Sequence, residues 1–292
     1  MSAITQAPAV PARRRRGSAR AVRTTLRYVV LVAVLLFAVF PFLWTLAIAL
    51  TDKTAGGSIY DFPASLFPHA LTLNNFVQVY QTFDLGRYVW NSVSITGMTV
   101  VGTLVVSALA AYPLARFRFP GRNVIFGVIV ATLVLPSETT FIVNTLTLKH
   151  LGLLATHLGV VVPTIAGAFG IFVMRQAFLT VPAALLEAAR LDGAGELTIL
   201  TRIMLPLTRP SQAALAIFTL VGTWNAYFWP MLVLSAAPEK VPLSVAVLKL
   251  KGQFNYDPFN IAAGSLFMML PVLIVFLAAQ RFFLNNTAGA VK

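Results

Sequence analysis

Long runs of uncharged apolar residues constrain the fold of this chain more than any other feature of its sequence. The first run covers residues 28–50, and a helix of that length can cross a hydrocarbon layer about 30 Å thick. Hydrophobic residues make up 58% of the chain and charged residues 11%, whereas a soluble domain averages about 45–50% and about 25%. One soluble core cannot bury so much apolar surface, but a bilayer can solvate it. The sequence therefore predicts an all-α integral membrane protein.

Six apolar runs are long enough to span a bilayer. The predicted spans cover residues 28–50, 88–114, 124–146, 158–178, 212–234 and 261–283. Residues 1–27 are rich in Ala, Pro and Arg and are predicted to form a disordered basic tail, and residues 284–292 form a short C-terminal tail. A cleaved signal peptide is the alternative for the first run, but the run exceeds the usual apolar core of about 7–15 residues. We therefore expect an uncleaved first helix.

Basic residues are distributed unequally between the two sides of this predicted topology. With the N-terminus in the cytoplasm, sixteen Lys and Arg lie on the cytoplasmic side and six on the opposite side. This asymmetry predicts an inner-membrane protein with cytoplasmic termini and a cytoplasmic loop over residues 179–210. The net charge of +13 then indicates contact with anionic lipid headgroups. It does not favour nucleic-acid binding, because the basic N-terminal run has no interleaved aromatic residues and no binding motif.

Several classes of function lack the residues that they need. The chain has no cysteine, and its histidines His69, His150 and His157 show no metal-ligand spacing, so we expect no metal and no cofactor. An intramembrane enzyme would need a nucleophile with a base, or a metal cluster, within the spans. An ion-driven secondary transporter would usually show internal repeats and paired acidic residues at mid-membrane depth. These two classes and a membrane scaffold are kept as alternatives.

The predicted cytoplasmic loop has the pattern of two short helices joined by a bend. Pro182 suits the start of the first helix. Asp192 and Gly193 provide its end, because Gly adopts the left-handed conformation that follows many helices. The apolar positions of this helix form one stripe, at Leu185, Leu186 and Ala189. Glu187 and Arg190 lie three residues apart on a neighbouring face.

The second helix of the loop begins with Glu196 in its first turn, where the helix dipole stabilises a carboxylate. Its apolar face comprises Leu197, Leu200, Ile203 and Met204. Pro206 is predicted to end it. Such an amphipathic pair suits docking into a groove of a soluble partner, although a helix lying on the lipid surface would show a similar pattern.

This loop resembles the EAA loop of ABC importer permeases. The residues at its defining positions are Glu187, Ala188, Ala189, Gly193, Ile203, Met204, Leu205 and Pro206. In that family the loop forms coupling helices that insert into a cleft of the ATP-binding subunit. The resemblance implies that Glu187 and Gly193 matter most for coupling, and that Ala188 and Ala189 pack closely against the partner.

The resemblance covers residues 25–292 and is to the carbohydrate branch, which contains maltose-type permeases and their sugar and glycerol-phosphate relatives. Outside the loop it rests on residues 115–121, 223–230 and 287–292, although Asn285-Asn286 departs from the usual Gly-Leu. It implies a type I permease bundle of six helices that pairs with a second, homologous permease. The other implied partners are a dimer of ATP-binding subunits, an extracytoplasmic substrate-binding protein and a carbohydrate or glycerol-3-phosphate substrate.

The chain lacks the glycine-rich loop with Lys and Ser or Thr that binds nucleotide phosphates. We therefore expect a non-catalytic subunit, with ATP hydrolysis in a separate chain. Candidate substrate-pathway residues are Glu138, Thr223, Trp224, Asn225 and Tyr227. Glu138 is a candidate because it is an acidic group at or near the outer end of a span. The hydrogen-bonding groups and aromatic faces of the other four suit sugar hydroxyls and sugar rings. An interfacial aromatic belt or helix-to-helix hydrogen bonding would explain the aromatic patch equally, and Glu138 would then cap a broken helix at the headgroup boundary.

Overall fold

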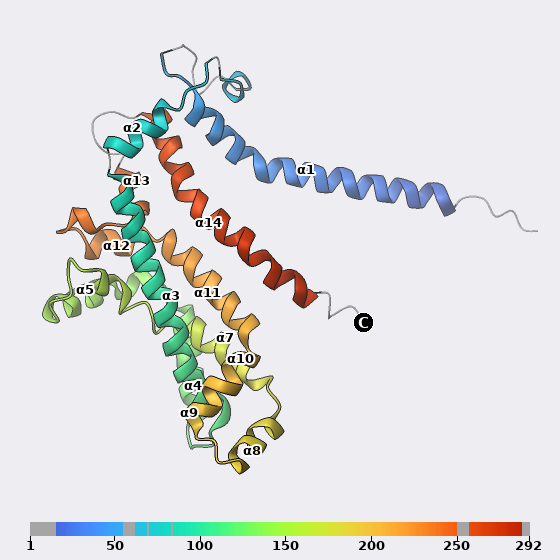
Figure 1. Cartoon of the computed structure of the whole chain (residues 1–292), viewed down its shortest axis with the longest axis vertical. Coiled ribbons are helices and arrows are strands. Elements are labelled where there is room, and N and C mark those ends of the chain that lie inside the picture. Colours follow the sequence, from blue (N-terminus) through green and yellow to red (C-terminus); the bar gives the residue numbers. More distant parts are fainter. Residues whose placement is uncertain (1–15, 55–61, 69, 83, 250–256, 288–292) are drawn as a thin grey trace, which may run out of the picture.

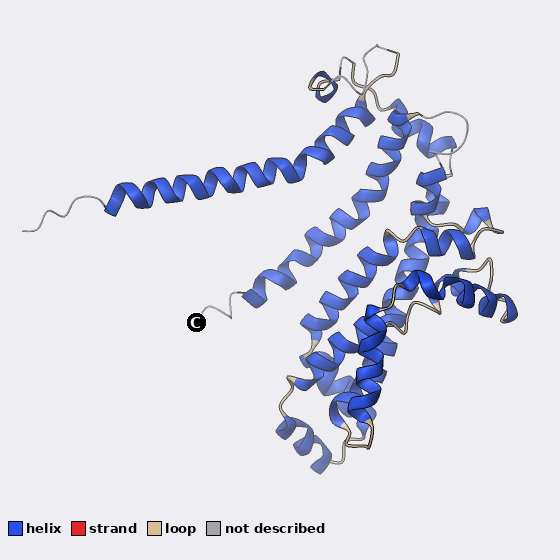
Figure 2. Cartoon of the chain, turned by 180° about the vertical axis from the view of Figure 1, so that it is seen from behind, coloured by secondary structure: helices blue, strands red, loops and turns tan. Residues whose placement is uncertain are grey.

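The computed structural model describes residues 16–54, 62–68, 70–82, 84–249 and 257–287. Within these ranges the chain forms helices and turns, with an isolated bridge between Thr51 and Leu71 (Figure 2). In chain order the elements are α1 (Arg16–Leu50), η1 (Ala64–Leu66), α2 (Asn74–Thr82), α3 (Leu85–Arg116), α4 (Arg122–Ala131), η2 (Thr132–Val134), η3 (Ser137–Thr140), α5 (Phe141–His150), α6 (His157–Val161), α7 (Ala168–Leu179), α8 (Ala183–Leu191), α9 (Glu196–Ile199), η4 (Leu200–Met204), α10 (Leu205–Leu207), α11 (Arg209–Trp224), α12 (Phe228–Val233), η5 (Pro238–Lys240), α13 (Leu243–Lys249) and α14 (Pro258–Thr287). His69, residues 1–15 of the predicted basic tail and residues 288–292 lie outside the described residues.

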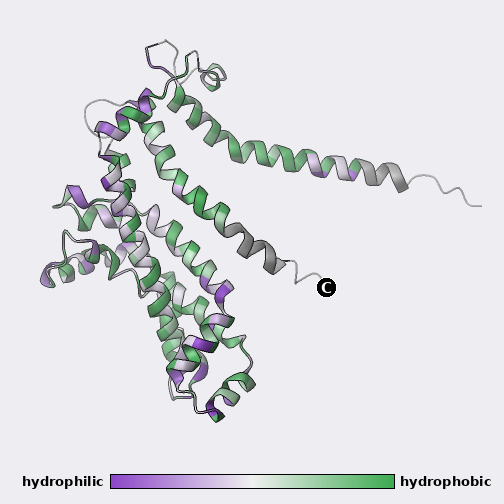
Figure 3. Cartoon of the chain, in the orientation of Figure 1, coloured by the Kyte–Doolittle hydropathy of each residue, from purple (hydrophilic) through white to green (hydrophobic). Residues whose placement is uncertain are grey.

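Three helices in the described part of the chain are long and apolar enough to cross a membrane alone. Their spanning portions, in α1, α3 and α14, are Val22–Leu50, Leu85–Arg116 and Pro258–Ala278, and Figure 3 shows apolar residues along most of their length. Two helix pairs also qualify if each bent pair counts as one span. These are Arg122–Val134 with Glu138–His150, bent by 97°, and Ala168–Leu179 with Ala183–Leu191, bent by 78°. The described residues therefore give three to five candidate spans, against the six predicted.

Three of the predicted spans are interrupted, namely 124–146, 158–178 and 212–234. Pro136 and Pro163 lie in the first two breaks, and Pro230 lies in the first turn of α12, after the third break. Proline interrupts a helix because it has no N–H to donate. The last break illustrates the consequence. The N–H that would bond the carbonyl of Ala226 is missing at Pro230, and the hydroxyl of Ser244 donates to that carbonyl instead, at 2.6 Å. Hydropathy alone does not register such breaks.

Helix α1 begins at Arg16 rather than at Tyr28, so residues 16–27 of the predicted disordered tail are helical. Ala and Arg are strong helix formers, and a helix already formed in an apolar run extends readily into such residues. Figure 1 shows α1 pointing away from the other helices, and none of its most apolar window is buried. Its C-terminal part is buried against the rest of the chain at Ala47 and Ala49.

Helix α3 is the centre of the bundle and packs against α6, α7, α11 and α13. It runs from the end of the molecule that carries α2, here called the α2 end, to the end that carries α8, the α8 end (Figure 1). Its buried polar side chains are Asn91, Ser92, Thr96, Thr99, Thr103 and Ser107. Near the α2 end, Asn91 Nδ2 donates to the carbonyls of Glu239 at 2.9 Å and Val241 at 3.0 Å. These bonds fix η5 and the chain leading into α13 against α3.

Helices α3 and α7 cross at close range because Gly170 has no side chain. A Cβ atom at Gly170 would lie 2.3 Å from Ser107 Oγ and 3.3 Å from both Ser107 Cβ and Thr103 Cγ2. Small residues allow helices to associate in lipid, where apolar surface alone gives no preference for one neighbour. The close α3–α7 crossing therefore depends on the small size of Gly170, Ser107 and Thr103.

We expect Gly170→Ala to destabilise the folded protein by about 1–3 kcal/mol, because the added methyl group overpacks the crossing. Thermal unfolding in detergent measures this loss. Gly127→Ala on α4 is the matched control, since a Cβ atom there meets nothing within 4 Å. Adding Ser107→Ala should recover part of the loss, because it removes the closest atom. Equal unfolding temperatures for the Gly170 and Gly127 variants would contradict this prediction.

Candidate functional site

The first helix of the predicted loop is α8, which lies at the extreme end of the bundle (Figure 1). It begins directly after Pro182, whose φ of −59° already suits a helix. It ends at Leu191 with Asp192 as its C-cap, and Gly193 follows with a φ of +83°. The N–H of Ala194 donates to the carbonyl of Ala189 at 2.9 Å, which closes the helix in a Schellman arrangement. The predicted start and end of this helix are confirmed.

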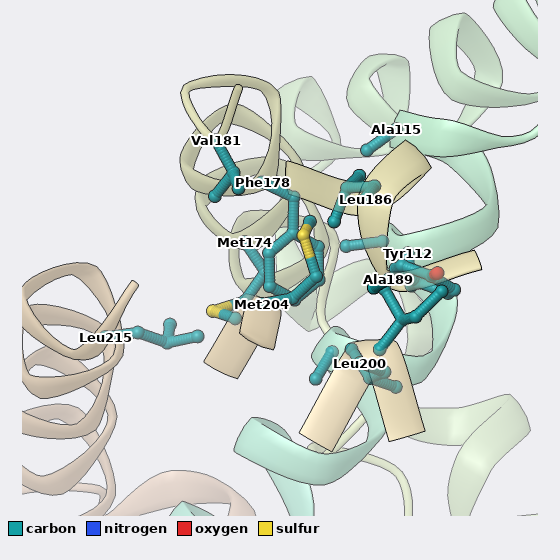
Figure 4. Close-up of a cluster of buried hydrophobic side chains, with 13 residues drawn as sticks. Tyr112, Ala115, Met174, Phe178, Val181, Leu186, Ala189, Leu200, Met204 and Leu215 are labelled. Atoms are coloured by element: carbon teal, nitrogen blue, oxygen red, sulfur yellow. The ribbon is translucent and has the colours of Figure 1, made fainter. Parts of the chain in front are cut away.

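Helix α8 has one buried and one exposed face. Leu186 and Ala189 are 2% and 9% exposed, and Figure 4 shows them in one cluster with Tyr112 of α3 and Phe178 of α7. The exposed side chains at helical spacing are Ala184, Glu187, Ala188 and Leu191, which we call the outer face of α8. Leu191 is 89% exposed. A helix closed by its own residues thus presents an apolar and acidic surface outward.

Ala188 and Ala189, for which the resemblance implied contact with a partner, lie on different faces of α8. Ala189 follows Leu186 by three positions and shares its inward face, in the chain's own hydrophobic cluster. Ala188 is exposed, so of the two it is better placed for the predicted partner contact, which stays a prediction.

The second helix of the loop continues further than predicted. It comprises α9, η4 and α10, and it passes through Pro206. In η4, a π-helical turn, the N–H of Leu205 donates to the carbonyl of Leu200, five residues earlier. Such a turn shifts the hydrogen-bond ladder just before Pro206, which has no N–H to continue it. The prediction that Pro206 ends this helix was wrong, since the break comes at Thr208, before α11.

Most of the apolar face predicted for this second helix packs inward. Leu200 and Met204 belong to the cluster shared with α8, and Ile203 and Leu205 pack against it. Leu197 is 68% exposed and faces away. Ile203 and Leu205, which match the EAA pattern, therefore hold the loop onto the bundle.

Glu196, in the first turn of α9, joins three elements. Arg190 of α8 donates to it from Nε to Oε1 at 3.0 Å and from Nη2 to Oε2 at 3.4 Å. The hydroxyl of Tyr112, on α3, donates to Oε2. Arg190 thus pairs across the Gly193 bend with Glu196 rather than with its neighbour Glu187. We call Tyr112, Arg190 and Glu196 the Glu196 cluster.

Two arginines connect the adjacent ends of α3 and α7. Arg116, the last residue of α3, donates through Nη2 to the carbonyls of Phe178 and Val181. Arg175 of α7 donates through Nε to the carbonyl of Leu114 at 3.0 Å, and its guanidinium lies 3.9 Å from the centre of an aromatic ring of α4. Helix ends leave carbonyl groups without partners in the helix. Each arginine therefore bonds carbonyl groups at the end of the other helix.

Sequence reasoning missed Tyr112 and Arg116. Their partners lie 62 to 84 residues away in the chain, so no local motif marks them. The one available signal is that they lie four residues apart at the end of a predicted span, which places two polar groups on one helix face.

The predicted substrate-pathway residues are not all equally accessible. Trp224 is buried, and its Nε1 donates to the carbonyl of Met268 at 2.9 Å, so it joins α11 to α14. Asn225 lines a cavity of about 310 Å³ together with Thr45 and Ser265. The remaining lining residues are Phe42, Leu266, Met268, Met269 and Val272.

The other three predicted residues lie outside this cavity lining. Thr223 is half-buried, and Tyr227 is 36% exposed. Glu138 is exposed in η3, at the break beside Pro136. Among the described residues, His, Asp and Glu form no group that could hold a metal ion.

The hydrogen bonds to Glu196 change its acidity. Its pKa lies below the ordinary value of 4.5, first because Arg190 and then because Tyr112 donates to the carboxylate. A carboxyl group whose pKa is lower in the folded state stabilises that state above its unfolded pKa. This contribution is lost as the pH falls through the folded pKa.

We therefore expect Glu196→Gln to reduce the loss of thermal stability between about pH 5 and about pH 3. Thermal unfolding in detergent over a pH series measures it. Glu187→Gln on the outer face of α8 is the matched control for the loss of one carboxylate from the loop. A Glu196→Gln profile identical to wild type would contradict the assigned bonds.

Comparison with known proteins identifies the family to which this arrangement belongs. Residues 103–286 match the family described as binding-protein-dependent transport system inner membrane component. The lactose transport system permease protein LacG of Rhizobium radiobacter is 33% identical over 269 residues, which are 91% of this chain and 95% of the relative. The arabinooligosaccharides transport system permease protein AraQ of Halalkalibacterium halodurans is 36% identical over 77% of this chain and 81% of the relative.

Further relatives extend the range of named substrates. The sn-glycerol-3-phosphate transport system permease protein UgpE of Yersinia enterocolitica is 30% identical over 91% of this chain and 96% of the relative. The fold is similar to a crystal structure of a bacterial ABC transporter involved in the import of the acidic polysaccharide alginate. That similarity has a TM-score of 0.78 at 26% identity and covers 94% of this chain and all of the other. The chain therefore belongs to the family of inner membrane components of binding-protein-dependent transport systems.

Proposed function

We propose that this chain is the permease subunit of a carbohydrate importer that is driven by ATP hydrolysis in a separate subunit. The observation that carries the proposal is the outer face of α8. Helix α8 ends in the left-handed turn at Gly193 and packs against the bundle through Leu186. Its side chains Glu187 and Leu191 remain exposed at the end of the bundle. A rigid amphipathic helix with an unpaired outer face suits insertion into a groove of a soluble partner.

The proposed topology has six spans and places both termini and the α8 end in the cytoplasm. Spans two, five and six then start with α3, α11 and α14, and span one is α1. The interrupted segments α4–α5 and α6–α7 supply spans three and four. The excess of Lys and Arg on one side, sixteen against six, supports this orientation. Breaks within membrane segments are tolerated where the freed backbone groups find partners inside the protein, as Ser244 provides for Ala226.

In the proposed assembly, each partner binds a surface that the chain itself leaves exposed. The outer face of α8 docks on one subunit of a dimer of ATP-binding chains, and Gly193 supplies the left-handed turn that orients it. The exposed apolar surface of α1 faces lipid and a second, homologous permease. An extracytoplasmic substrate-binding protein delivers the substrate at the α2 end. Binding and hydrolysis of ATP would then drive alternating access of the membrane helices.

The substrate class proposed for this importer is a neutral oligosaccharide or sugar. Relatives named for lactose and arabinooligosaccharides support it. The cavity beside Asn225 adds a physical argument, because Thr45, Asn225 and Ser265 offer neutral hydrogen-bonding groups and the rest of its lining is apolar. Such a surface suits sugar hydroxyls and ring faces.

Glycerol-3-phosphate import is the second candidate, because a relative carries that name. A phosphate group is normally held by Arg, Lys or backbone N–H groups, and the described cavity lining contains no Arg or Lys. Calorimetric titration of the cognate binding protein with sugars and with glycerol-3-phosphate distinguishes the two. Tight binding of glycerol-3-phosphate alone would overturn the carbohydrate proposal.

Co-purification tests the docking surface. We expect Leu191→Ser to reduce the ATP-binding chain recovered with the affinity-purified protein about tenfold or more, because an apolar anchor is lost from the interface. Leu73→Ser is the matched control, since Leu73 is 68% exposed next to α2 at the opposite end. Equal recovery with both variants would contradict docking through α8, and wild-type protein that captures no ATPase would contradict the proposed function.

A further inference from the structure

Tyr112 is held rigidly at the point where α3 meets the loop. It is 4% exposed. Its ring makes edge-to-face contacts with Phe117, at 5.4 Å between centroids, and with Phe178, at 6.3 Å. Such contacts orient an aromatic ring, and Figure 4 shows it within the cluster that Leu200 and Ala189 complete. The ring therefore aims its hydroxyl at Glu196 from a fixed position.

Arg116, one turn further along α3, bonds the chain just before α8. Its two acceptors, the carbonyls of Phe178 and Val181, flank the junction between α7 and α8, and Val181 directly precedes Pro182. Tyr112 and Arg116 thus bond the chain on either side of the loop's first helix. Tyr112 reaches its C-terminal end through the Glu196–Arg190 pair, and Arg116 reaches the residues before its start.

The remaining contacts between this helix and the bundle are of a different kind. Leu186 and Ala189 pack through apolar side chains, and such contacts are non-directional. Hydrogen bonds to a carboxylate and to carbonyl groups depend on angle and distance. A displacement of α8 can therefore slide over the apolar cluster, but it cannot leave the bonds to α3 intact unless α3 follows.

We propose that Tyr112 and Arg116 are positioning residues that transmit the displacement of α8 and α9 to α3. This inference rests on the proposed function. Helix α3 runs the whole length of the bundle, and at the α2 end Asn91 donates to the carbonyls of Glu239 and Val241. One helix thus connects the coupling surface with the segment that would face the substrate-binding protein.

The test measures substrate moved per ATP hydrolysed by the complete transporter in proteoliposomes. Tyr112→Phe removes the hydroxyl and keeps both ring contacts, and we expect it to lower this ratio about fivefold or more. Tyr80→Phe on α2 is the matched control, because Tyr80 is 60% exposed at the opposite end. Arg116→Lys keeps the charge but replaces the planar guanidinium, whose Nη2 donates to both carbonyls, by a compact ammonium on a flexible stem. It should lower the ratio as well.

The double variant Tyr112→Phe with Glu196→Gln distinguishes a loss of motion transmitted from α8 to α3 from a general loss of stability. Both changes act on the path from Tyr112 through Glu196 to Arg190, so their effects on the ratio should be less than additive. A lower yield or unfolding temperature with an unchanged ratio per assembled complex would show a merely structural role and overturn the proposal. If wild-type complexes couple normally and Tyr112→Phe also does, only this inference fails. If wild-type complexes show no ATP-driven uptake, the proposed function fails with it.

Discussion

The hydrogen bonds that α3 supplies at its α8 end organise the structure around the loop. Arg116 bonds carbonyl groups at the end of α7, and Arg175 of α7 bonds one in the last turn of α3. Carbonyl groups at helix ends are costly to leave unpaired away from water, so both helices are constrained to end side by side. The Glu196 cluster then attaches the second helix of the loop to the same point. The position of α8 depends on these bonds.

The two faces of α8 have different roles in this arrangement. The inner face completes the chain's own cluster through Leu186 and Ala189, so the helix keeps its position without a partner. The outer face is then preorganised, which lowers the entropic cost of association. Small residues have a related role at the α3–α7 crossing, where Gly170 allows a close approach between backbones. A bundle built this way can pass a displacement between its ends with little internal deformation.

Features encoded within one or two turns were predictable from the sequence. Pro182 and Gly193 mark the start and end of α8 because each fixes a backbone angle by its own chemistry. The lengths of the apolar runs predicted α3 and α14. They could not predict the break before Pro230, because the loss of helix hydrogen bonds does not change hydropathy. At Pro206 the sequence predicted a helix end, but the helix continues, because the π-helical turn η4 accommodates the proline. The helix α13 lies between two predicted spans and was not anticipated.

Long-range contacts in the site were not predictable. Tyr112 and Glu196 are 84 residues apart, and only the folded bundle brings them together. Arg190 illustrates how tertiary structure overrides spacing, since the bend at Gly193 brings it to Glu196. Trp224 is a residue type suited to sugar binding, but in the structure its indole N–H donates to a carbonyl of α14.

Coupling through Tyr112 and Arg116 requires that α3 and α8 move as one body. Since the chain has no cysteine, spin labels on cysteines introduced at Leu109 and Leu185 report without background, and both sites are about half exposed, at 53% and 47%. Pulsed electron paramagnetic resonance would measure their separation in transporters whose ATP-driven uptake is intact. If the two helices move together, the distance distribution is the same without nucleotide and with a non-hydrolysable ATP analogue, and it becomes broader and nucleotide-dependent in Tyr112→Phe. A wild-type distance that shifts with nucleotide would contradict it.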